Sequence, residues 1–315
     1  MSAPWDEGYF VKLKLDVVFK RVFGERQNIR LTKGLISDLL EIPRDEIQNV
    51  EILNVEIPPE RWRQKFNRLD LQLQVDDKIV NVEMQVRGEK HFRERSLFYW
   101  SRIYTRDLKE GEKYRNLKQT ICVNILDFNL FEDEDDYHTA VRVTYGKRRR
   151  VFTKKFAIHV FELKKLDRFR KGAPKEDWLG LINVGSKEEL MTIIESAVIP
   201  EVRDAGRILL DFQADERVRQ EAWYREKQMH DEASQIDDAY EEGRAEGREE
   251  GRAEGREEGR EEGREEGKEE GREEGTLQTL ARLVARGCLT VSEAAEDAGM
   301  SVEEFENLTK SQTKR

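Results

Sequence analysis

Two carboxylates and a carboxamide, placed along the stretch RLDLQLQVDDKIVNVEMQV (residues 68–86), have the residue types of a metal site. Twelve residues separate Asp70 from Glu83, and Gln85 follows two positions later. Carboxylates on adjacent strands can jointly bind Mg²⁺, a hard cation that prefers oxygen ligands, and the Met84 carbonyl could add another oxygen. Such an ion lowers the pKa of an attacking water and offsets charge on a phosphate. The Gln85 amide could then orient the water or contact a phosphate oxygen.

The elements that must bring these residues together are two strands of a hairpin. Alternating apolar and polar residues predict both strands, with a two-residue turn at 76–77. Such a turn pairs Val75 with Lys78. Counting back along the strands then places Asp70 directly opposite Glu83. Like charges that face each other across strands are destabilising, and a bound cation would remove that cost.

The alternative interpretation of the hairpin is a polar strand face that meets solvent. The same register places Gln72 opposite Asn81, so amides accompany the carboxylates on this face. Polar faces of this kind are common in antiparallel sheets. The spacing alone therefore leaves both interpretations open.

The composition predicts a globular protein whose charge is unevenly distributed. The chain has 315 residues, of which 37% are hydrophobic and 39% charged, with a net charge of -10. Residues 241–275 alone hold sixteen Glu and eight Lys or Arg, so the rest of the chain is nearly neutral. The acidity therefore does not exclude a nucleic-acid partner. Two distant cysteines and no apolar run of membrane-spanning length predict a cytoplasmic protein without a membrane partner.

Residues 8–240 predict a mixed α/β domain. The expected order is two helices, three strands, a helix and two strands, followed by further helices. The first helix would bury Val18, Phe19, Val22 and Phe23, and end at Gly24. The helix within 89–108 has these apolar residues at helical spacing: Phe92, Leu97, Trp100, Ile103 and Tyr104.

Residues 241–275 form a low-complexity repeat in which Gly recurs every four residues, nine times. Glu and Arg three residues apart favour a helix, whereas each Gly costs about 1 kcal/mol relative to Ala. We expect a partly helical, frayed spacer. In an assembly, the glycines would also allow close contact with another helix.

Residues 276–315 predict a small module of three helices. Thr290 with Glu293, and Ser301 with Glu304, have the spacing of capping boxes, and Gly287 and Gly299 end helices. The pattern resembles a helix-turn-helix. DNA recognition requires basic residues on the last helix, and VEEFENL is acidic. The sequence thus favours packing or self-association over DNA contact.

Three segments in order carry a family resemblance: DVVFKRVFG, then RLDLQLQV with VNVEMQV, then FRERSLFYWSRIYTRDLKEGEKYRNLKQTICVNILDFNLF. Together they resemble the Rpn-type recombination-promoting nucleases, also described as transposases of the PD-(D/E)XK nuclease family. The resemblance covers most of residues 10–240 and extends to the Glu-Gly-Arg repeat and the helical tail. It implies a restriction-endonuclease-like mixed sheet flanked by helices, and DNA cleavage that depends on Mg²⁺ or Mn²⁺.

The resemblance also implies roles for individual residues. Asp70 and Glu83 fall on the metal-binding carboxylates, and Gln85 falls where the wider superfamily commonly has a catalytic Lys. Asp16 and Lys20 lie four residues apart on one face of the first helix. An acidic residue there often joins the metal site, and Lys20 is a candidate for the missing cation. The alternative is a surface ion pair between the two.

Other charged residues have weaker signals. Arg93, Arg95 and Arg102 could contact backbone phosphates or form a solvated helix face. His159 lies in an apolar strand and is expected to be a core histidine, and residues 133–136 are expected to be a solvated acidic loop.

These features predict a metal-dependent DNA endonuclease linked to recombination, mobile elements or defence. A homodimer or higher homo-oligomer would suit double-strand cleavage, because each strand needs its own site. The alternative is a non-catalytic, DNA-associated or self-assembling protein built on a relic nuclease core.

Overall fold

The computed structural model describes residues 5, 8–53, 71–88, 90–106, 108–166 and 173–312. The chain divides into two compact units, Met1–Asp231 and Glu232–Arg315. The first unit is an α/β body. The second contains most of helix α7 (Glu216–Ala285) and the helices that follow it.

The body is built on a mixed six-stranded sheet, which confirms the predicted fold class. Its strands, in spatial order, are β1 (Val50–Ile52), β2 (Leu71–Val75), β3 (Lys78–Gln85), β4 (Gln119–Leu126), β8 (Phe156–Glu162) and β5 (His138–Val141). Strands β1, β2 and β3 are antiparallel, β3, β4 and β8 are parallel, and β5 is antiparallel to β8.

The β2–β3 hairpin has the predicted register. Val75 lies opposite Lys78, and Gln72 lies opposite Asn81. The two-residue turn between the strands is therefore confirmed. Local alternation and turn length were sufficient to set this pairing.

The turn itself is tied to the loop before β1. Asp76 has a φ of 51°, and its carboxylate accepts hydrogen bonds from the backbone N–H groups of Gln48 and Asn49. The Asp76 side chain thus replaces solvent as a partner for two backbone donors.

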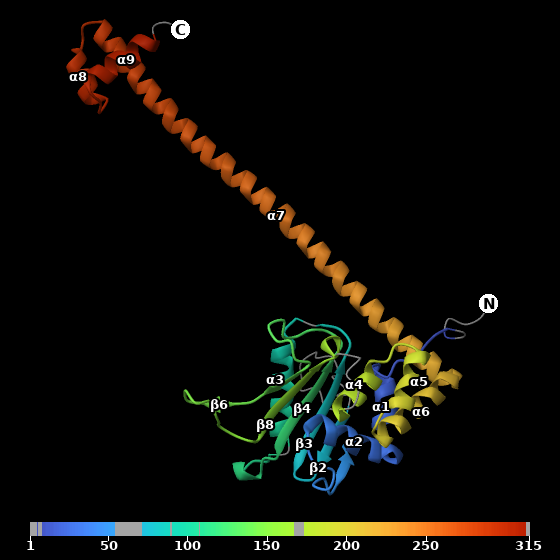
Figure 1. Cartoon of the computed structure of the whole chain (residues 1–315). Helices are drawn as coiled ribbons and strands as arrows, with labels where there is room; N and C mark the ends of the chain where they lie inside the picture. The colour runs from blue at the N-terminus through green and yellow to red at the C-terminus, as the bar shows by residue number, and fades with distance from the viewer. Residues whose placement is uncertain are drawn as a thin grey trace. The chain divides into compact units, whose positions relative to one another are not determined.

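Most helices of the body cover one face of the sheet. They are α1 (Asp16–Phe23), α2 (Ile29–Leu40), α4 (Pro174–Asn183), α5 (Lys187–Ser196) and α6 (Pro200–Ala214). Their apolar side chains join Leu73, Val82 and Val123 of the sheet in one large core. Figure 1 shows α1, α2, α4 and α6 together on the side of the sheet away from α3. The predicted apolar face of the first helix is confirmed, and its cap residue is Gly24.

Helix α3 (Phe92–Thr105) covers the other face. Phe92 and Ile103 pack on Cys122 and Leu126 of β4, and the Trp100 indole donates a hydrogen bond to the Thr120 carbonyl at 2.9 Å. The helix is confirmed, but Leu97 from its predicted apolar set is 49% exposed. One stripe of side chains on α3 packs against the sheet, and Leu97 lies outside that stripe.

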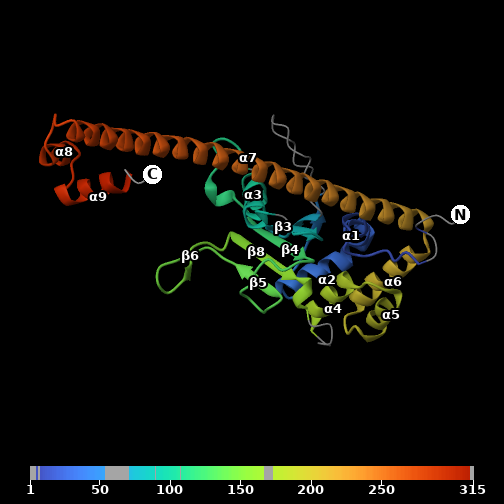
Figure 2. The ribbon, with the colours of Figure 1, turned by 90° about the horizontal axis from the view of Figure 1, so that it is seen from above.

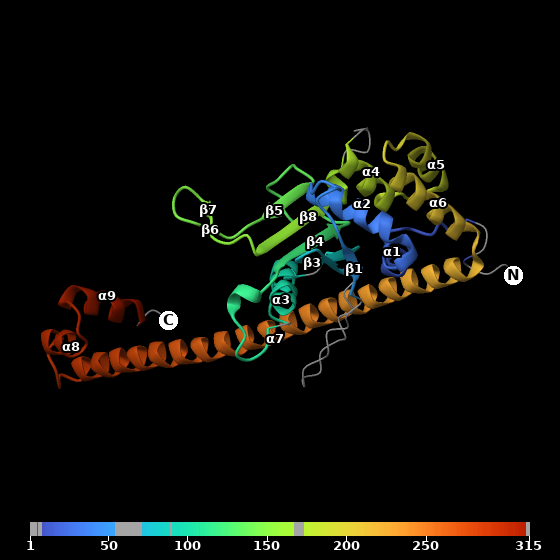
Figure 3. The ribbon, with the colours of Figure 1, turned by 90° about the horizontal axis from the view of Figure 1, so that it is seen from below.

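A second, two-stranded sheet was not predicted. Strands β6 (Thr144–Tyr145) and β7 (Arg150–Val151) pair antiparallel, outside the main sheet. The hairpin extends away from the six-stranded sheet in every view (Figure 1, Figure 2 and Figure 3). Strands of two residues carry too little alternation to be recognised in sequence.

The repeat is helical throughout, where the sequence predicted a partial helix. Helix α7 continues through 241–275, and the side chains of these residues are exposed. The residues between the glycines are Glu, Arg, Ala and Lys, all strong helix formers. A Cβ added at Gly243 or Gly275 would meet no other atom within 4 Å.

The last turns of α7 pack with α8 (Val291–Asp297) and α9 (Val302–Gln312) around Leu280, Ala294, Ala295 and Phe305. Both predicted capping boxes are present, at Thr290 with Glu293 and at Ser301 with Glu304. Gly287 and Gly299 have positive φ, as expected for the residues after helix ends. Within the described ranges, no helix is both long and apolar enough to cross a membrane.

Candidate active site

A polar face of the β2–β3 hairpin lies on the side of the sheet that α3 covers. Gln72 and Asn81 are directly opposite each other on this face, and Glu83 and Gln85 follow at alternate positions of β3. Gln72 and Asn81 are 2% and 1% exposed, so the start of this face is buried. Glu83 and Gln85 are half-buried. The face therefore becomes more accessible toward the carboxyl end of β3.

Glu83 is held in place by its neighbour on the same strand. The Asn81 side-chain amide donates a hydrogen bond to Glu83 Oε1 at 3.0 Å. Burial raises the pKa of the Cys122 thiol on β4, and the charge of Glu83 raises it further. The Glu83 carboxylate is thus close enough to β4 to act electrostatically on a thiol of that strand.

Two amide atoms on this polar face lack hydrogen-bond partners among the described residues. They are Asn81 Oδ1 and Gln72 Nε2, and both are buried. A buried polar group without a partner costs about 1–3 kcal/mol. An unpaired acceptor oxygen beside a carboxylate is a suitable ligand environment for a hard cation.

A guanidinium group engages the Gln85 side chain. Arg95 of α3 donates a hydrogen bond from Nη2 to Gln85 Oε1 at 2.9 Å, and Gln85 Nε2 donates to the Arg87 carbonyl at 3.3 Å. The Arg95 guanidinium also lies 5.2 Å from the Phe92 ring centre. Gln85 therefore sits beside a permanent positive charge that the strand itself does not carry.

Further cations line the polar face. Arg106 donates a hydrogen bond to Gln72 Oε1, and Lys118 Nζ donates to Gln74 Oε1 at 3.0 Å. Neither residue was singled out from the sequence, because the helix end and the loop that carry them meet β2 only in the fold. Together with Arg95, these two residues bring three positive charges to the polar face of the hairpin.

The other two arginines of α3 that the sequence suggested point elsewhere. Arg93 donates to the Leu130 carbonyl at 2.9 Å and lies over the Phe131 ring. Arg102 lies 6.0 Å from the Phe98 ring centre. Of the three, Arg95 is the one that donates a hydrogen bond to Gln85 on the hairpin's polar face.

Asp16 has a different partner from the one that the sequence suggested. Its Oδ1 accepts a hydrogen bond from Arg225 Nε of α7 at 2.8 Å, and the two form an ion pair. Lys20, one turn further along α1, is half-buried. Among the described residues, no hydrogen bond or ion pair joins Asp16 to Glu83.

Asp70 lies outside the described residues, so its place opposite Glu83 stays a prediction. The last described pair of the ladder is Leu71 with Val82, one step before that position. Within the part of the chain that the structure covers, no three or more His, Cys, Asp or Glu side chains gather as a metal site would require.

The oxygens near Glu83 fit a divalent cation. Besides the carboxylate, Asn81 Oδ1 is an oxygen on this face, and Met84, which follows Glu83 on β3, contributes a main-chain carbonyl oxygen. The main-chain carbonyl of Gln85 accepts a hydrogen bond from the Asp127 N–H at 2.9 Å, so this carbonyl points toward β4. Because alternate residues point to opposite neighbours, the Met84 carbonyl points to the β2 side. All of these donors are oxygens, as Mg²⁺ prefers.

His138 and His159 form a structural cluster near α4, whose Lys175 Nζ lies 3.4 Å from His138 Nδ1. His159 is 7% exposed, and its Nδ1 and Nε2 lie 3.0 Å from His138 Nε2 and 3.0 Å from Arg142 Nη2, respectively. Burial, with the nearby Arg142 charge, lowers the pKa of His159 to about 3. The predicted core histidine is thus confirmed, and the acidic residues 133–136 form an exposed loop as expected.

Comparison with known proteins supports the assignment that the hairpin suggests. A family model described as PD-(D/E)XK nuclease family transposase matches residues 13–239, which include β1 to β8 and most helices of the body. Neither the comparison with curated proteins nor that with solved structures gives a match. The matched segment is more than half of the chain and contains the whole polar face of the hairpin. The chain therefore belongs to the PD-(D/E)XK nuclease family transposases.

Proposed function

We propose that the protein is a metal-dependent DNA endonuclease that hydrolyses phosphodiester bonds at the β2–β3 hairpin. Family membership supports a nuclease or transposase role. The observation that carries the finer proposal is the register of the hairpin. The pairing of Leu71 with Val82 supports a position for Asp70 opposite Glu83, and Gln85 follows on the same polar face.

Asp70 and Glu83 would hold Mg²⁺ or Mn²⁺, with Asn81 Oδ1 or the Met84 carbonyl as a further ligand. When bound, the ion supplies positive charge to the phosphate and lowers the pKa of water. Asp16 is a less favoured metal ligand in this proposal, because its ion pair with Arg225 would first have to break.

Gln85 and Arg95 have complementary roles. The Gln85 amide can orient a water or a phosphate oxygen, but it carries no charge. Arg95, hydrogen-bonded to Gln85 at 2.9 Å, supplies that charge. An Arg side chain stays protonated, so it stabilises negative charge on the phosphate without transferring a proton. Lys20 of α1 remains the alternative candidate for this cation.

The partners in this proposal are DNA and a second copy of the chain. Each protomer would cut one strand of a duplex, in the cytoplasm, during recombination, transposition or defence. The Glu-Gly-Arg repeat and the helical tail would tether or pair the nuclease bodies.

A second candidate function is self-assembly without catalysis. It is favoured by the exposed side chains of 241–275 on α7 and by the open space around the glycines there. Such a surface permits close approach of another helix.

The test is cleavage of supercoiled plasmid with Mg²⁺ or Mn²⁺ by the wild type, Asp70→Ala, Glu83→Ala and Asp77→Ala. Asp77 is the matched control, because it lies in the turn of the same hairpin with its side chain 87% exposed. We expect the wild type and Asp77→Ala to cut, and the other two variants to lose about 10³-fold or more in rate.

Two outcomes would contradict the proposal. Equal cutting by all four proteins would place the activity elsewhere or in a contaminant. No cutting by the wild type, together with no rise in its melting temperature with Mn²⁺, would favour the assembly function.

A further inference from the structure

The β6–β7 hairpin and its flanks are the most basic stretch of the body. Residues 142–155 contain no Asp or Glu, and their basic residues are Arg142, Lys147, Arg148, Arg149, Arg150, Lys154 and Lys155. Every residue from 142 to 152 is exposed. The tip therefore presents four consecutive cations, 147–150, to solvent.

One face of this hairpin is apolar and aromatic. The Phe152 N–H bonds to the Val143 carbonyl, and Tyr145 pairs with Arg150, so these four side chains share one face. Val143, Tyr145 and Phe152 are 38%, 53% and 70% exposed. A contiguous exposed apolar surface in a two-stranded hairpin indicates an interaction site.

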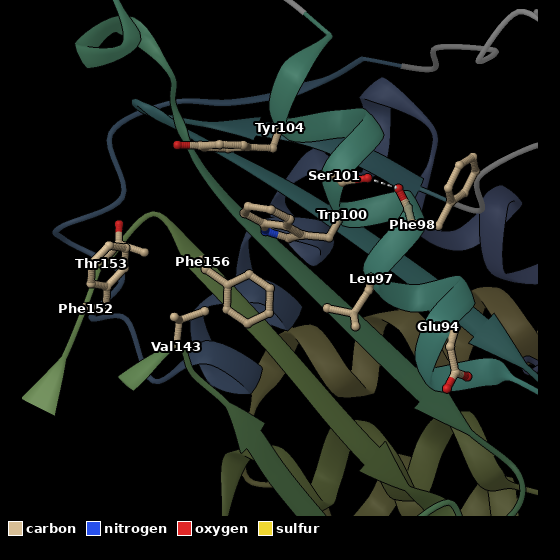
Figure 4. A pocket seen from close by; sticks show the side chains of 10 residues that line it. All are labelled: Glu94, Leu97, Phe98, Trp100, Ser101, Tyr104, Val143, Phe152, Thr153 and Phe156. Atoms are coloured by element: carbon tan, nitrogen blue, oxygen red, sulfur yellow. Dashed lines mark hydrogen bonds between the residues drawn. The ribbon is translucent and has the colours of Figure 1, made fainter. Parts of the chain in front are cut away.

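This face continues into a groove beside α3. Figure 4 shows Leu97, Trp100 and Tyr104 of α3 facing Val143, Phe152 and Phe156 across it. The groove has a volume of about 650 Å³, and the Trp100 and Tyr104 rings stack with centres 4.6 Å apart. Glu94 lies among its lining residues and is the acidic group there.

We infer that the basic tip and the aromatic groove together form a nucleic-acid-binding surface. Lysines and arginines bind phosphates without reading sequence. Exposed aromatic rings beside such a patch provide stacking surfaces for unpaired bases, which single-strand-binding proteins use. The tip 147–150 would contact the backbone, and the groove at Phe152, Trp100 and Tyr104 would receive unpaired bases.

Helix α3 connects this surface to the candidate active site. Arg95 and Ser96 face the sheet, where they bond to Gln85 and Asn124, while Leu97 and Tyr104 line the groove. A strand held in the groove would thus lie against the helix that also contacts the hairpin's polar face. The inference rests on the proposed function only in the choice of DNA rather than RNA as ligand.

The main rival occupant is the acidic repeat of a second copy. Its charge is complementary to the tip, but residues 241–275 consist only of Glu, Gly, Arg, Ala and Lys. They contain no aromatic or large apolar side chain that could fill the groove. Nucleic acid satisfies both the charge of the tip and the aromatic character of the groove.

The test measures DNA binding by fluorescence anisotropy with the full chain carrying Glu83→Ala, without divalent ions. The probes are a labelled single strand and a labelled duplex of about 20 nucleotides, over about 50–200 mM salt. The tip variant combines Lys147→Gln, Arg148→Gln, Arg149→Gln and Arg150→Gln. The matched control removes the same charge from the repeat, by Arg256→Gln, Arg260→Gln, Arg264→Gln and Lys268→Gln.

We expect the tip variant to bind both probes about ten-fold or more weakly, with a salt slope shallower by about three for four lost phosphate contacts. The repeat variant should keep the affinity and slope of the parent. Phe152→Ala should weaken single-strand binding about 5- to 100-fold and leave the slope unchanged, because stacking is not a charge effect. Unchanged melting of the tip variant would show that the body is intact.

The inference is overturned if the tip and repeat variants bind alike, since only net charge would then matter. It is also overturned if the tip variant keeps its DNA affinity but loses self-association in sedimentation, since the acidic repeat would then be the partner. Because binding is measured without cleavage, plasmid cutting can fail while the surface stands, or the reverse.

Discussion

The body of the protein contains two β-hairpins of opposite construction. The β2–β3 hairpin lies inside the main sheet between β1 and β4, and Leu73 and Val82 in it are completely buried. In the described part of the chain, β6 and β7 pair only with each other, and Val151 of β7 is 51% exposed. The first carries Glu83 and the second carries four adjacent cations.

The difference separates two requirements of a nuclease. Groups that act on a reacting phosphate must be held to within a fraction of an ångström, and a buried hairpin with fixed register provides this. Groups that only attract a polyanion need charge and reach, and they tolerate movement. We therefore expect substitutions in β2–β3 to act on stability and turnover, and those in β6–β7 on affinity and salt dependence.

The largest expected effect concerns stability. Leu73→Ala should lower the free energy of unfolding by about 2–5 kcal/mol, because it removes a fully buried side chain from the core. Val151→Ala, in the exposed hairpin, should change it by less than about 0.5 kcal/mol. Urea unfolding of both variants measures the contrast. Equal losses would mean that β6–β7 is packed against a partner.

The next contrast concerns turnover. Arg95→Gln removes the charge beside Gln85 and should lower the cleavage rate at saturating DNA about 10²-fold. Arg148→Gln should raise the DNA concentration needed for half-maximal rate and leave the saturated rate unchanged. Single-turnover plasmid cleavage separates the two. A saturated rate that falls for Arg148→Gln would erase the distinction between the hairpins.

The stability of the protein should depend on pH through His159, which lies beside the base of the β6–β7 hairpin. Arg142, which precedes β6, lies 3.0 Å from His159, whose pKa is lowered from 6.5 to about 3 by burial and nearby cations. Below about pH 6.5, His159 therefore binds a proton in the unfolded state but stays neutral in the folded state. Stability should fall as the pH drops from about 6.5 toward 3, by up to about 1.4 kcal/mol per pH unit.

His159→Gln should remove that part of the slope, and His91→Gln, at an exposed position, should retain it. Chemical unfolding between about pH 6.5 and 4.5 gives the comparison. An unchanged slope in His159→Gln would show that carboxylates alone cause the acid sensitivity.

The smallest effect compares the two turns. Each has a non-glycine residue with positive φ, Asp76 at 51° and Arg149 at 47°. Asp76→Gly relieves that conformation but loses the bonds to the Gln48 and Asn49 N–H groups, so stability should fall by about 1 kcal/mol. Arg149→Gly should be within about 0.5 kcal/mol of the wild type. Thermal melting of both variants checks this, and an equal loss would contradict the role given to the Asp76 carboxylate.

The same two hairpins show how far sequence reasoning reaches. The pairing of Gln72 with Asn81 followed from local alternation and a two-residue turn. The β6–β7 hairpin was missed because strands of two exposed residues leave no periodic signal. The hairpin can be recognised as part of a binding surface only in the fold, where its basic residues lie beside the groove that α3 lines.

Contacts between distant segments were also beyond the sequence. Asp16 and Arg225 are 209 residues apart, and only the packing of α7 on α1 brings them together. The direction of Arg95 toward Gln85 depends on which stripe of α3 meets the sheet, and the apolar spacing of α3 wrongly included Leu97 in that stripe.

The different reactivities of the two cysteines can be used to measure how often the main sheet opens. Cys288 is exposed, whereas Cys122 is buried on the central strand β4, where it pairs with Asn81 of β3. A thiol reagent attacks the thiolate, and both burial and the Glu83 charge suppress that form at Cys122. Cys288 should therefore react at once, and Cys122 only in molecules whose sheet has opened. The lag between the two reactions reports how often the strand that adjoins the candidate site comes apart, and a cation that stabilises the closed sheet should lengthen it.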